Sequence, residues 1–192
     1  MKRVLPLLMV LLAPCVAAAE DFPADRIVAA ATGDWDRDGN TDLALIARPA
    51  EGSDEDNAVF IYLANPGESR LALKVSAPNK ISGNLTMFGQ EPTVAALANG
   101  SIKLTSQNSS IGRDRWSQSL TLAYRGGRFI VAGYTYSSYD TLDNDNTRAC
   151  DLNVLTGKGT ANGKPITTAG AQIAYEDWSD EIGRKACGFG SQ

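Results

Sequence analysis

Residues 116–136 read WSQSLTLAYRGGRFIVAGYTY, and this stretch decides the fold class. Before the Arg125-Gly126-Gly127 turn, apolar residues alternate with small polar ones, so one face of the segment is apolar and the other is polar. A period of two is typical of a β-strand that is covered on one side only. The sequence therefore predicts an antiparallel hairpin with strands at 116–124 and 128–136.

A second hairpin signal precedes the first. Asn99-Gly100 separates Val94–Ala98 from Ser101–Ser106, and the Asn-Gly pair tolerates the positive φ values of a type I′ turn. We therefore expect central hairpins over residues 93–136.

The remaining chain is rich in turn-forming residues and has short apolar runs, which favours further strands. The expected strands are Leu43–Arg48, Ala58–Leu63, Arg70–Ser76, Leu152–Leu155, Pro165–Thr168 and Ala171–Tyr175. Pro78–Pro92 is predicted to be a long loop, and one helical turn is expected near Asp180–Lys185. Because no linker-like change of composition divides the chain, we expect one mainly β, antiparallel domain over residues 20–192, with little helix.

The amino terminus has the pattern of a secretory signal peptide. Two basic residues precede the apolar stretch Val4–Val16, and Ala17-Ala18-Ala19 supplies small residues for cleavage after Ala19. We expect residues 1–19 to be removed and the mature chain to be periplasmic or secreted. No later segment has the 18 apolar residues of a membrane span.

Lipid anchoring at Cys15 is the alternative at this end. Leu12-Ala13-Pro14-Cys15 resembles a bacterial lipobox. Pro14 stands where that motif prefers a small residue, so we favour cleavage after Ala19.

The mature chain would be acidic. Of the 18 basic residues, Lys2 and Arg3 lie in the signal peptide, which leaves 16 against 22 acidic residues and a net charge of −6. Nucleic-acid binding requires a basic footprint, so it is not expected. Nucleotide binding is not expected either, because Thr156–Thr160 lacks the glycine and hydroxyl spacing of a phosphate-binding loop.

Cleavage also leaves two cysteines, Cys150 and Cys187. An even pair in an exported protein is typical of a disulfide, and buried free thiols are the alternative. A bridge would close residues 150–187 and stabilise the fold by about 4 kcal/mol in the chain-entropy description.

The nine residues 34–42 read DWDRDGNTD and are the strongest chemical signal in the chain. Asp34, Asp36 and Asp38 occupy alternate positions, a glycine at position 6 permits a sharp bend, and Asp42 stands at position 9. This spacing suits a hard cation such as Ca²⁺, with the carbonyl of Asn40 completing the set of oxygens. Four carboxylates at such close range repel one another unless a cation neutralises them.

An EF-hand is the nearest alternative cation loop. It requires a bidentate Glu at position 12 and a helix on each side. Position 12 is Leu45, and the flanking residues favour strands, so we do not expect an EF-hand.

Gly33, the nine residues 34–42 and the following Leu43-Ala44-Leu45-Ile46 together resemble the FG-GAP/VCBS calcium loop of integrin α-chain propellers. The resemblance covers about residues 27–48. It implies a strand-loop-strand hairpin in which Asp34, Asp36, Asp38 and Asp42 bind calcium. Only one such loop is present, and a propeller has four or more blades, so a complete propeller is not expected.

Each candidate site has a simpler alternative. An acidic solvated turn would also favour the residues of 34–42. Asp140–Asp145 is either a second, weaker cation site or an acidic connection between strands. A group of aromatic residues forms either a ligand platform or core packing; its members are Trp116, Tyr134, Tyr136, Tyr139 and Trp178.

The chain contains no histidine. This excludes Ser-His-Asp and Cys-His nucleophilic sites and histidine-dependent zinc chemistry. Our first hypothesis is an exported, non-enzymatic calcium-binding protein that binds a protein or an envelope polymer. The alternatives are a small carboxylate-dependent hydrolase of envelope glycans, and an inhibitor of an exported enzyme that uses Pro78–Pro92 as its protruding loop.

Overall fold

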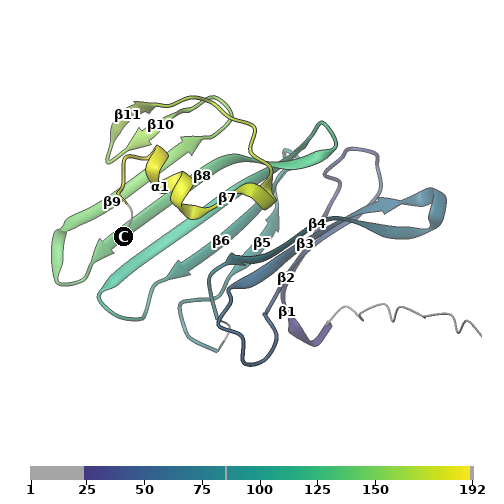
Figure 1. The fold of residues 1–192 in the computed structure, drawn as a ribbon, viewed down its shortest axis with the longest axis horizontal. Helices are drawn as coiled ribbons and strands as arrows, with labels where there is room; N and C mark the ends of the chain where they lie inside the picture. Colours follow the sequence, from purple (N-terminus) through teal and green to yellow (C-terminus); the bar gives the residue numbers. More distant parts are fainter. Residues whose placement is uncertain (1–23, 85, 191–192) are drawn as a thin grey trace, which may run out of the picture.

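The computed structural model describes residues 24–84 and 86–190, and these residues form two antiparallel sheets (Figure 1). The first sheet has four strands in the order β1-β2-β3-β4. Their bounds are β1 (Ile27–Gly33), β2 (Asp42–Ala47), β3 (Asn57–Asn65) and β4 (Arg70–Ile81). The predicted signal peptide and Cys15 lie outside the described residues.

The second sheet has seven strands in the order β11-β10-β9-β8-β7-β6-β5, so each strand pairs with its neighbour in sequence. The bounds are β5 (Thr93–Ala96), β6 (Ile102–Asn108), β7 (Asp114–Arg125), β8 (Arg128–Asp140), β9 (Asp143–Asn153), β10 (Lys158–Ala161) and β11 (Lys164–Thr167). The prediction of a mainly β fold built from hairpins is confirmed, and the described strands form neither a closed barrel nor a propeller.

Helical structure is short and peripheral. Three single turns are η1 (Ala24–Arg26), η2 (Pro66–Glu68) and η3 (Tyr175–Asp177). The helix α1 (Asp180–Ala186) matches the predicted helical turn and lies across one face of the larger sheet (Figure 1). Gly183 of α1 sits against the Tyr134 ring of β8, where an added Cβ would come within 2.6 Å of the ring.

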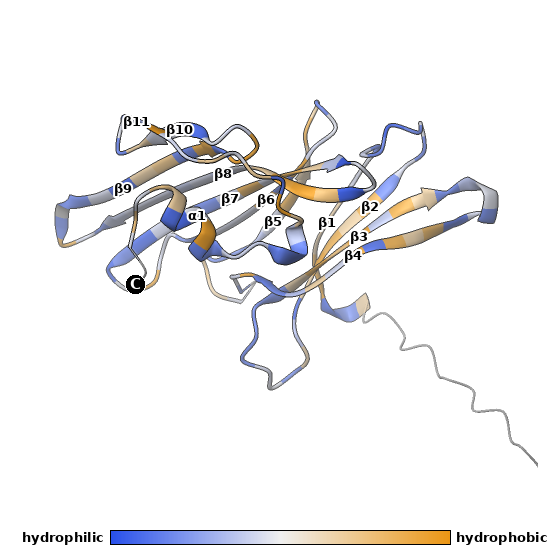
Figure 2. Ribbon diagram, turned by 45° about the horizontal axis from the view of Figure 1, so that its top comes forward, coloured by the Kyte–Doolittle hydropathy of each residue, from blue (hydrophilic) through white to orange (hydrophobic). Residues whose placement is uncertain are grey.

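One hydrophobic core joins the two sheets. Its members include Ile46 and Ile61 from the first sheet and Leu104 and Leu122 from the second. In Figure 2 hydrophobic colours follow strands such as β2 and β3, while most connections are hydrophilic. Strand β1 lies beside β5 without pairing to it, so the sheets meet through side chains.

Several parts of the secondary-structure prediction were wrong. Strand β4 continues to Ile81, four residues into the predicted loop Pro78–Pro92. Residues 143–153 form the strand β9, of which only the end was predicted. Lys158–Ala161, where no strand was predicted, is the strand β10. In these three segments, pairing with neighbouring strands supplies hydrogen bonds that the local sequence does not predict.

The predicted strand Ala171–Tyr175 is also absent. Its residues run alongside β8 through one isolated bridge, Ile130 to Ala174, and then enter η3. This bridge holds the extended segment before α1 against β8, although the segment does not form the series of backbone hydrogen bonds of a strand.

The Asn99-Gly100 turn differs in type from the prediction. Gly100 has a φ of 78°, and its N–H donates to the carbonyl of Leu97 at 2.9 Å. Asn99 has no positive φ, so this is a type I turn followed by a glycine in the left-handed region rather than a type I′ turn.

A disulfide joins Cys150 of β9 to Cys187, immediately after α1, with 6.0 Å between the two Cα atoms. This confirms the predicted pair and fastens the carboxyl-terminal helix to the sheet. Among the described residues, no helix is both long enough and apolar enough to cross a membrane.

Candidate metal centre

The residues that resemble a calcium loop connect β1 to β2. Gly33 at the end of β1 pairs with Asp42 at the start of β2, so the loop begins and ends at one point. Within it Arg37 has a φ of 65° and Gly39 a φ of 86°. These left-handed residues curl the loop and turn its backbone N–H groups toward its own carboxylates.

Three of the expected ligands come together. Asp34, Asp36 and Asp42 each offer a carboxylate oxygen, and the three oxygens all lie within 4.8 Å of one another. Carboxylate oxygens are the ligands that Ca²⁺ prefers, and it takes six to eight oxygens at about 2.3–2.6 Å. The donor set is therefore of the right chemistry for this ion.

Backbone hydrogen bonds hold the first two carboxylates. Asp34 accepts from the N–H of Asp38 at 3.0 Å and from that of Gly39 at 3.1 Å. Asp36 accepts from the same Asp38 N–H at 3.2 Å. The loop is thereby wrapped around its acids, as expected when a short segment must present several oxygens inward.

Asp42 is the anchor of the site and is only 1% exposed. Its Oδ2 accepts from the Trp35 N–H at 2.8 Å, and its Oδ1 accepts from the Ala64 N–H of β3 at 2.9 Å. Buried charges require such partners. Asp42 therefore fixes the loop to the first sheet and is available as a ligand at the same time.

Asp38 and Asn40 lie differently from the other expected ligands. The exposed Asp38 carboxylate is outside the three-carboxylate group, and its Oδ1 accepts from the Asn40 N–H at 2.8 Å. This backbone hydrogen bond lowers the pKa of Asp38. Both residues remain on the loop, one residue on either side of Gly39.

Burial and the neighbouring carboxylates both disfavour the charged form of Asp36. Burial raises the pKa of this carboxyl, and the charges of Asp42, Asp38 and Asp34 raise it further, against the lowering effect of the Asp38 N–H. A divalent cation among the three carboxylates would remove this repulsion.

The loop also contacts the second sheet. Arg37 donates from its guanidinium to the backbone carbonyl of Asn99 at 3.1 Å. Trp35, for which the sequence pattern predicted no role, is 2% exposed and belongs to the core. An added Cβ at Gly33 would lie 2.7 Å from the Trp35 Nε1, so this glycine leaves room for the indole ring.

The residues Asp140–Asp145 lie in the β8–β9 hairpin. Asp140 is buried and forms an ion pair with Arg113, whose Nε lies 2.8 Å from Oδ2. This hydrogen-bonded guanidinium lowers the pKa of Asp140. Within the described residues, only the β1–β2 loop gathers three acidic side chains closely enough for a metal ion, so Asp140 serves the fold.

Most of the candidate aromatic platform is core. Tyr134 and Tyr136 are buried and stacked, with ring centroids 6.4 Å apart. Trp178 packs on Tyr134 at 5.7 Å. Tyr139 is half exposed and occupies the other face of β8, because its position is odd where those of Tyr134 and Tyr136 are even.

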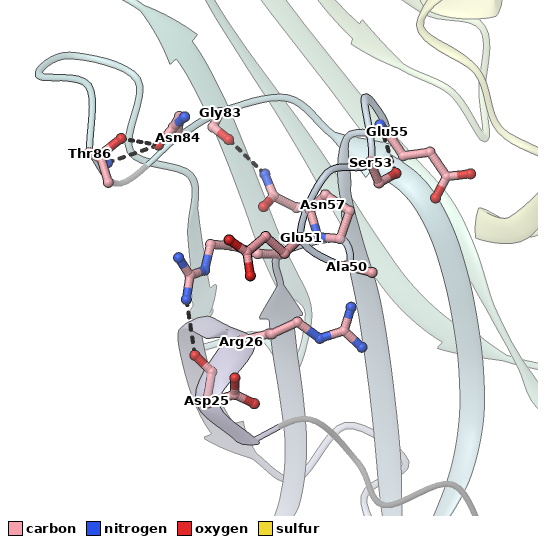
Figure 3. A pocket seen from close by; sticks show the side chains of 12 residues that line it. Asp25, Arg26, Ala50, Glu51, Ser53, Glu55, Asn57, Gly83, Asn84 and Thr86 are labelled. Carbon is pink, nitrogen blue, oxygen red and sulfur yellow. Dashed lines mark hydrogen bonds between the residues drawn. The ribbon is translucent and has the colours of Figure 1, made fainter.

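A charged groove of about 730 Å³ lies at the opposite end of the first sheet (Figure 3). Side chains from η1, from the β2–β3 loop and from the segment after β4 line it, including Arg26, Glu51 and Glu55. Asn57 closes one wall by donating to the Gly83 carbonyl at 2.9 Å. The groove carries both signs of charge.

The pKa of the Asp180 carboxyl is raised, as is that of Asp36, chiefly by burial. Asp180 accepts from Gln118 Nε2 at 2.7 Å beneath α1. Asp180 does not line the charged groove. The raised pKa and the charged groove, which a carboxylate-dependent hydrolase would combine, therefore lie apart.

Comparisons with protein-family models, with curated proteins and with solved structures gave no match for this chain.

Proposed function

We propose that this is an exported, non-enzymatic calcium-binding protein that acts as a binding module of the cell envelope. The three carboxylates of Asp34, Asp36 and Asp42, within 4.8 Å of one another, carry the proposal. The spacing of the loop and its resemblance to the FG-GAP/VCBS calcium loop favour Ca²⁺ over a solvated turn. Asp38 and the carbonyl of Asn40 would add further oxygen ligands after a local adjustment of the loop.

The ion would have a structural role. The loop contacts β3 through Asp42 and the β5–β6 turn through Arg37. A cation that stiffens the loop would therefore stiffen the junction between the two sheets. Extracellular modules commonly bind calcium with dissociation constants of about 10⁻⁴–10⁻³ M. The site would therefore be filled by the calcium outside the cell, and the ion need not act as a signal.

Export is supported by the amino-terminal pattern and by the disulfide, which is compatible with an oxidising compartment. The partner would be a protein or an envelope polymer.

Calcium titration of the mature chain tests the proposal. Chelator should lower the thermal midpoint and calcium should restore it, because an ion that binds only the folded state stabilises it by mass action. Asp36→Ala and Asp38→Ala should abolish the restoration. Asp54→Asn, an exposed acid of the β2–β3 loop, is the matched control and should respond as the unchanged protein does. A midpoint that is insensitive to calcium in the unchanged protein would contradict the proposal.

A further inference from the structure

A cavity of about 490 Å³ lies directly beside the candidate metal centre. Three connections surround it: the β1–β2 loop, the β5–β6 turn and the end of β7 at the β7–β8 turn. Its volume falls within the range of small-ligand sites, about 300–1,000 Å³. Loops held by a rigid scaffold commonly carry binding residues, and here all three are held by the two sheets.

The cavity shares Asp36 with the metal centre. An ion bound to Asp36 would therefore lie next to the wall of the cavity. Ca²⁺ takes six to eight oxygens, and both oxygens of Asp42 already accept backbone N–H groups. Coordination positions therefore remain for oxygens from outside the protein.

Two arginines set the charge preference of the cavity. Arg37 is held by its hydrogen bond to Asn99, and Arg125 is exposed at the end of β7. Arg125 forms no ion pair within residues 24–84 and 86–190. Calcium would offset two of the carboxylate charges of the metal centre, and the two other charged side chains of the cavity lining, Arg37 and Arg125, are positive. The anionic group of a ligand is therefore favoured beside these arginines.

Aromatic and polar groups complete the lining. Tyr124 is half-buried, and its ring is fixed against Phe129 with centroids 5.0 Å apart. Trp35 also lines the cavity, and its buried Nε1–H has no hydrogen-bond partner in the described structure. A ligand that offers both an apolar ring face and hydroxyl groups matches this combination.

We propose that this cavity binds an acidic saccharide, a sugar ring that carries a carboxylate and neighbouring hydroxyl groups, with the calcium ion as part of the binding site. The saccharide oxygens fill the open positions of the ion, Arg125 pairs with the carboxylate, and the ring lies against Tyr124. This inference rests on the proposed calcium site and specifies which envelope polymer the protein recognises.

Isothermal titration calorimetry with trigalacturonate tests the inference. The mature protein is titrated first with calcium alone, then with trigalacturonate at saturating calcium and in chelator, with calcium added to trigalacturonate as the blank. Maltotriose, a neutral trisaccharide of the same length, is the control ligand. We expect trigalacturonate to bind in calcium only, and maltotriose to bind at least tenfold more weakly.

A matched pair of arginine variants locates the site. Arg125→Ala should weaken trigalacturonate binding by about tenfold or more, as expected when a charged hydrogen bond is lost. Arg128→Ala removes the same charge from the other side of the same turn, at a residue that does not line the cavity. It should leave the affinity within about twofold, and neither variant should change calcium binding.

The outcomes separate the two proposals. If calcium binds but trigalacturonate does not, or binds equally well in chelator, the saccharide site is overturned and the calcium site stands. Equal losses in Arg125→Ala and Arg128→Ala would also overturn it, because they would indicate diffuse charge attraction. If calcium itself does not bind, the proposed function fails first.

Discussion

Asp42 accepts a hydrogen bond from the backbone N–H of Trp35 at 2.8 Å, and this contact closes the acidic loop across its two ends. The other oxygen of the same carboxylate accepts from Ala64 of β3. A single buried side chain therefore supports the loop, the first sheet and the candidate metal centre together.

Asp42→Asn should destabilise the protein even without calcium. The amide has only one acceptor oxygen, so one of the two backbone N–H groups would face an NH₂ group instead. A buried donor without a partner costs about 1–3 kcal/mol. Urea unfolding in chelator should show a loss of this size. Asp38→Asn, at an exposed carboxylate of the same loop, is the control, and equal stability of the two variants would contradict the assigned role of Asp42.

Removal of the disulfide should lower the free energy of unfolding by about 4 kcal/mol, because the bridge closes 37 residues of chain. The double variant Cys150→Ala with Cys187→Ala should show this loss in urea unfolding. The unchanged protein with and without reductant provides the control. If reductant leaves the midpoint unchanged while the thiols become reactive, the bridge does not stabilise the fold.

Local pattern was sufficient for most of the fold. The β7–β8 hairpin was predicted because Leu120 and Leu122 alternate with polar residues and both are buried. The strand β9 was largely missed because its sequence, DNDNTRACDLN, has no such alternation. Much of this strand is exposed, and it is held by pairing to its sequence neighbours β8 and β10, which the residue pattern within the strand does not show.

The same limit applies to the site. The spacing of the acids predicted that Asp34, Asp36, Asp38 and Asp42 would come together, since a short loop constrains them. In the structure three of them do, and Asp38 lies outside the group. The hydrogen bond from Ala64 to Asp42 and the burial of Trp35 depend on how β3 and the second sheet pack against the loop. The cavity beside Arg125 is formed by the β1–β2 loop, the β5–β6 turn and the end of β7. A local sequence pattern cannot predict how these three segments come together.

Gly183→Ala should destabilise the protein although alanine favours helices. The new methyl group would come within 2.6–2.8 Å of the Tyr134 ring, so α1 must move away from the sheet. Overpacking of this kind costs about 1–3 kcal/mol. Gly190→Ala is the control, since an added Cβ there meets nothing within 4 Å. A thermal midpoint for Gly183→Ala equal to that of the control would show that α1 does not pack as described.

Asp180→Asn should stabilise the protein at neutral pH. Burial raises the pKa of Asp180, against the lowering effects of the Gln118 hydrogen bond and of the Arg184 and Lys80 charges. The folded state therefore holds this proton more tightly than the unfolded state. Asp180 contributes most below the ordinary carboxyl pKa, and that contribution is lost as pH rises through the folded pKa.

Asparagine carries no charge and can still accept from Gln118, so the advantage of the variant should be present at pH 7 and disappear toward pH 3. Urea unfolding across this range measures it. Glu181→Gln removes an exposed charge from the same first turn of α1 and controls for the interaction with the helix dipole. If both variants show the same pH dependence, the helix terminus rather than the burial of Asp180 is responsible.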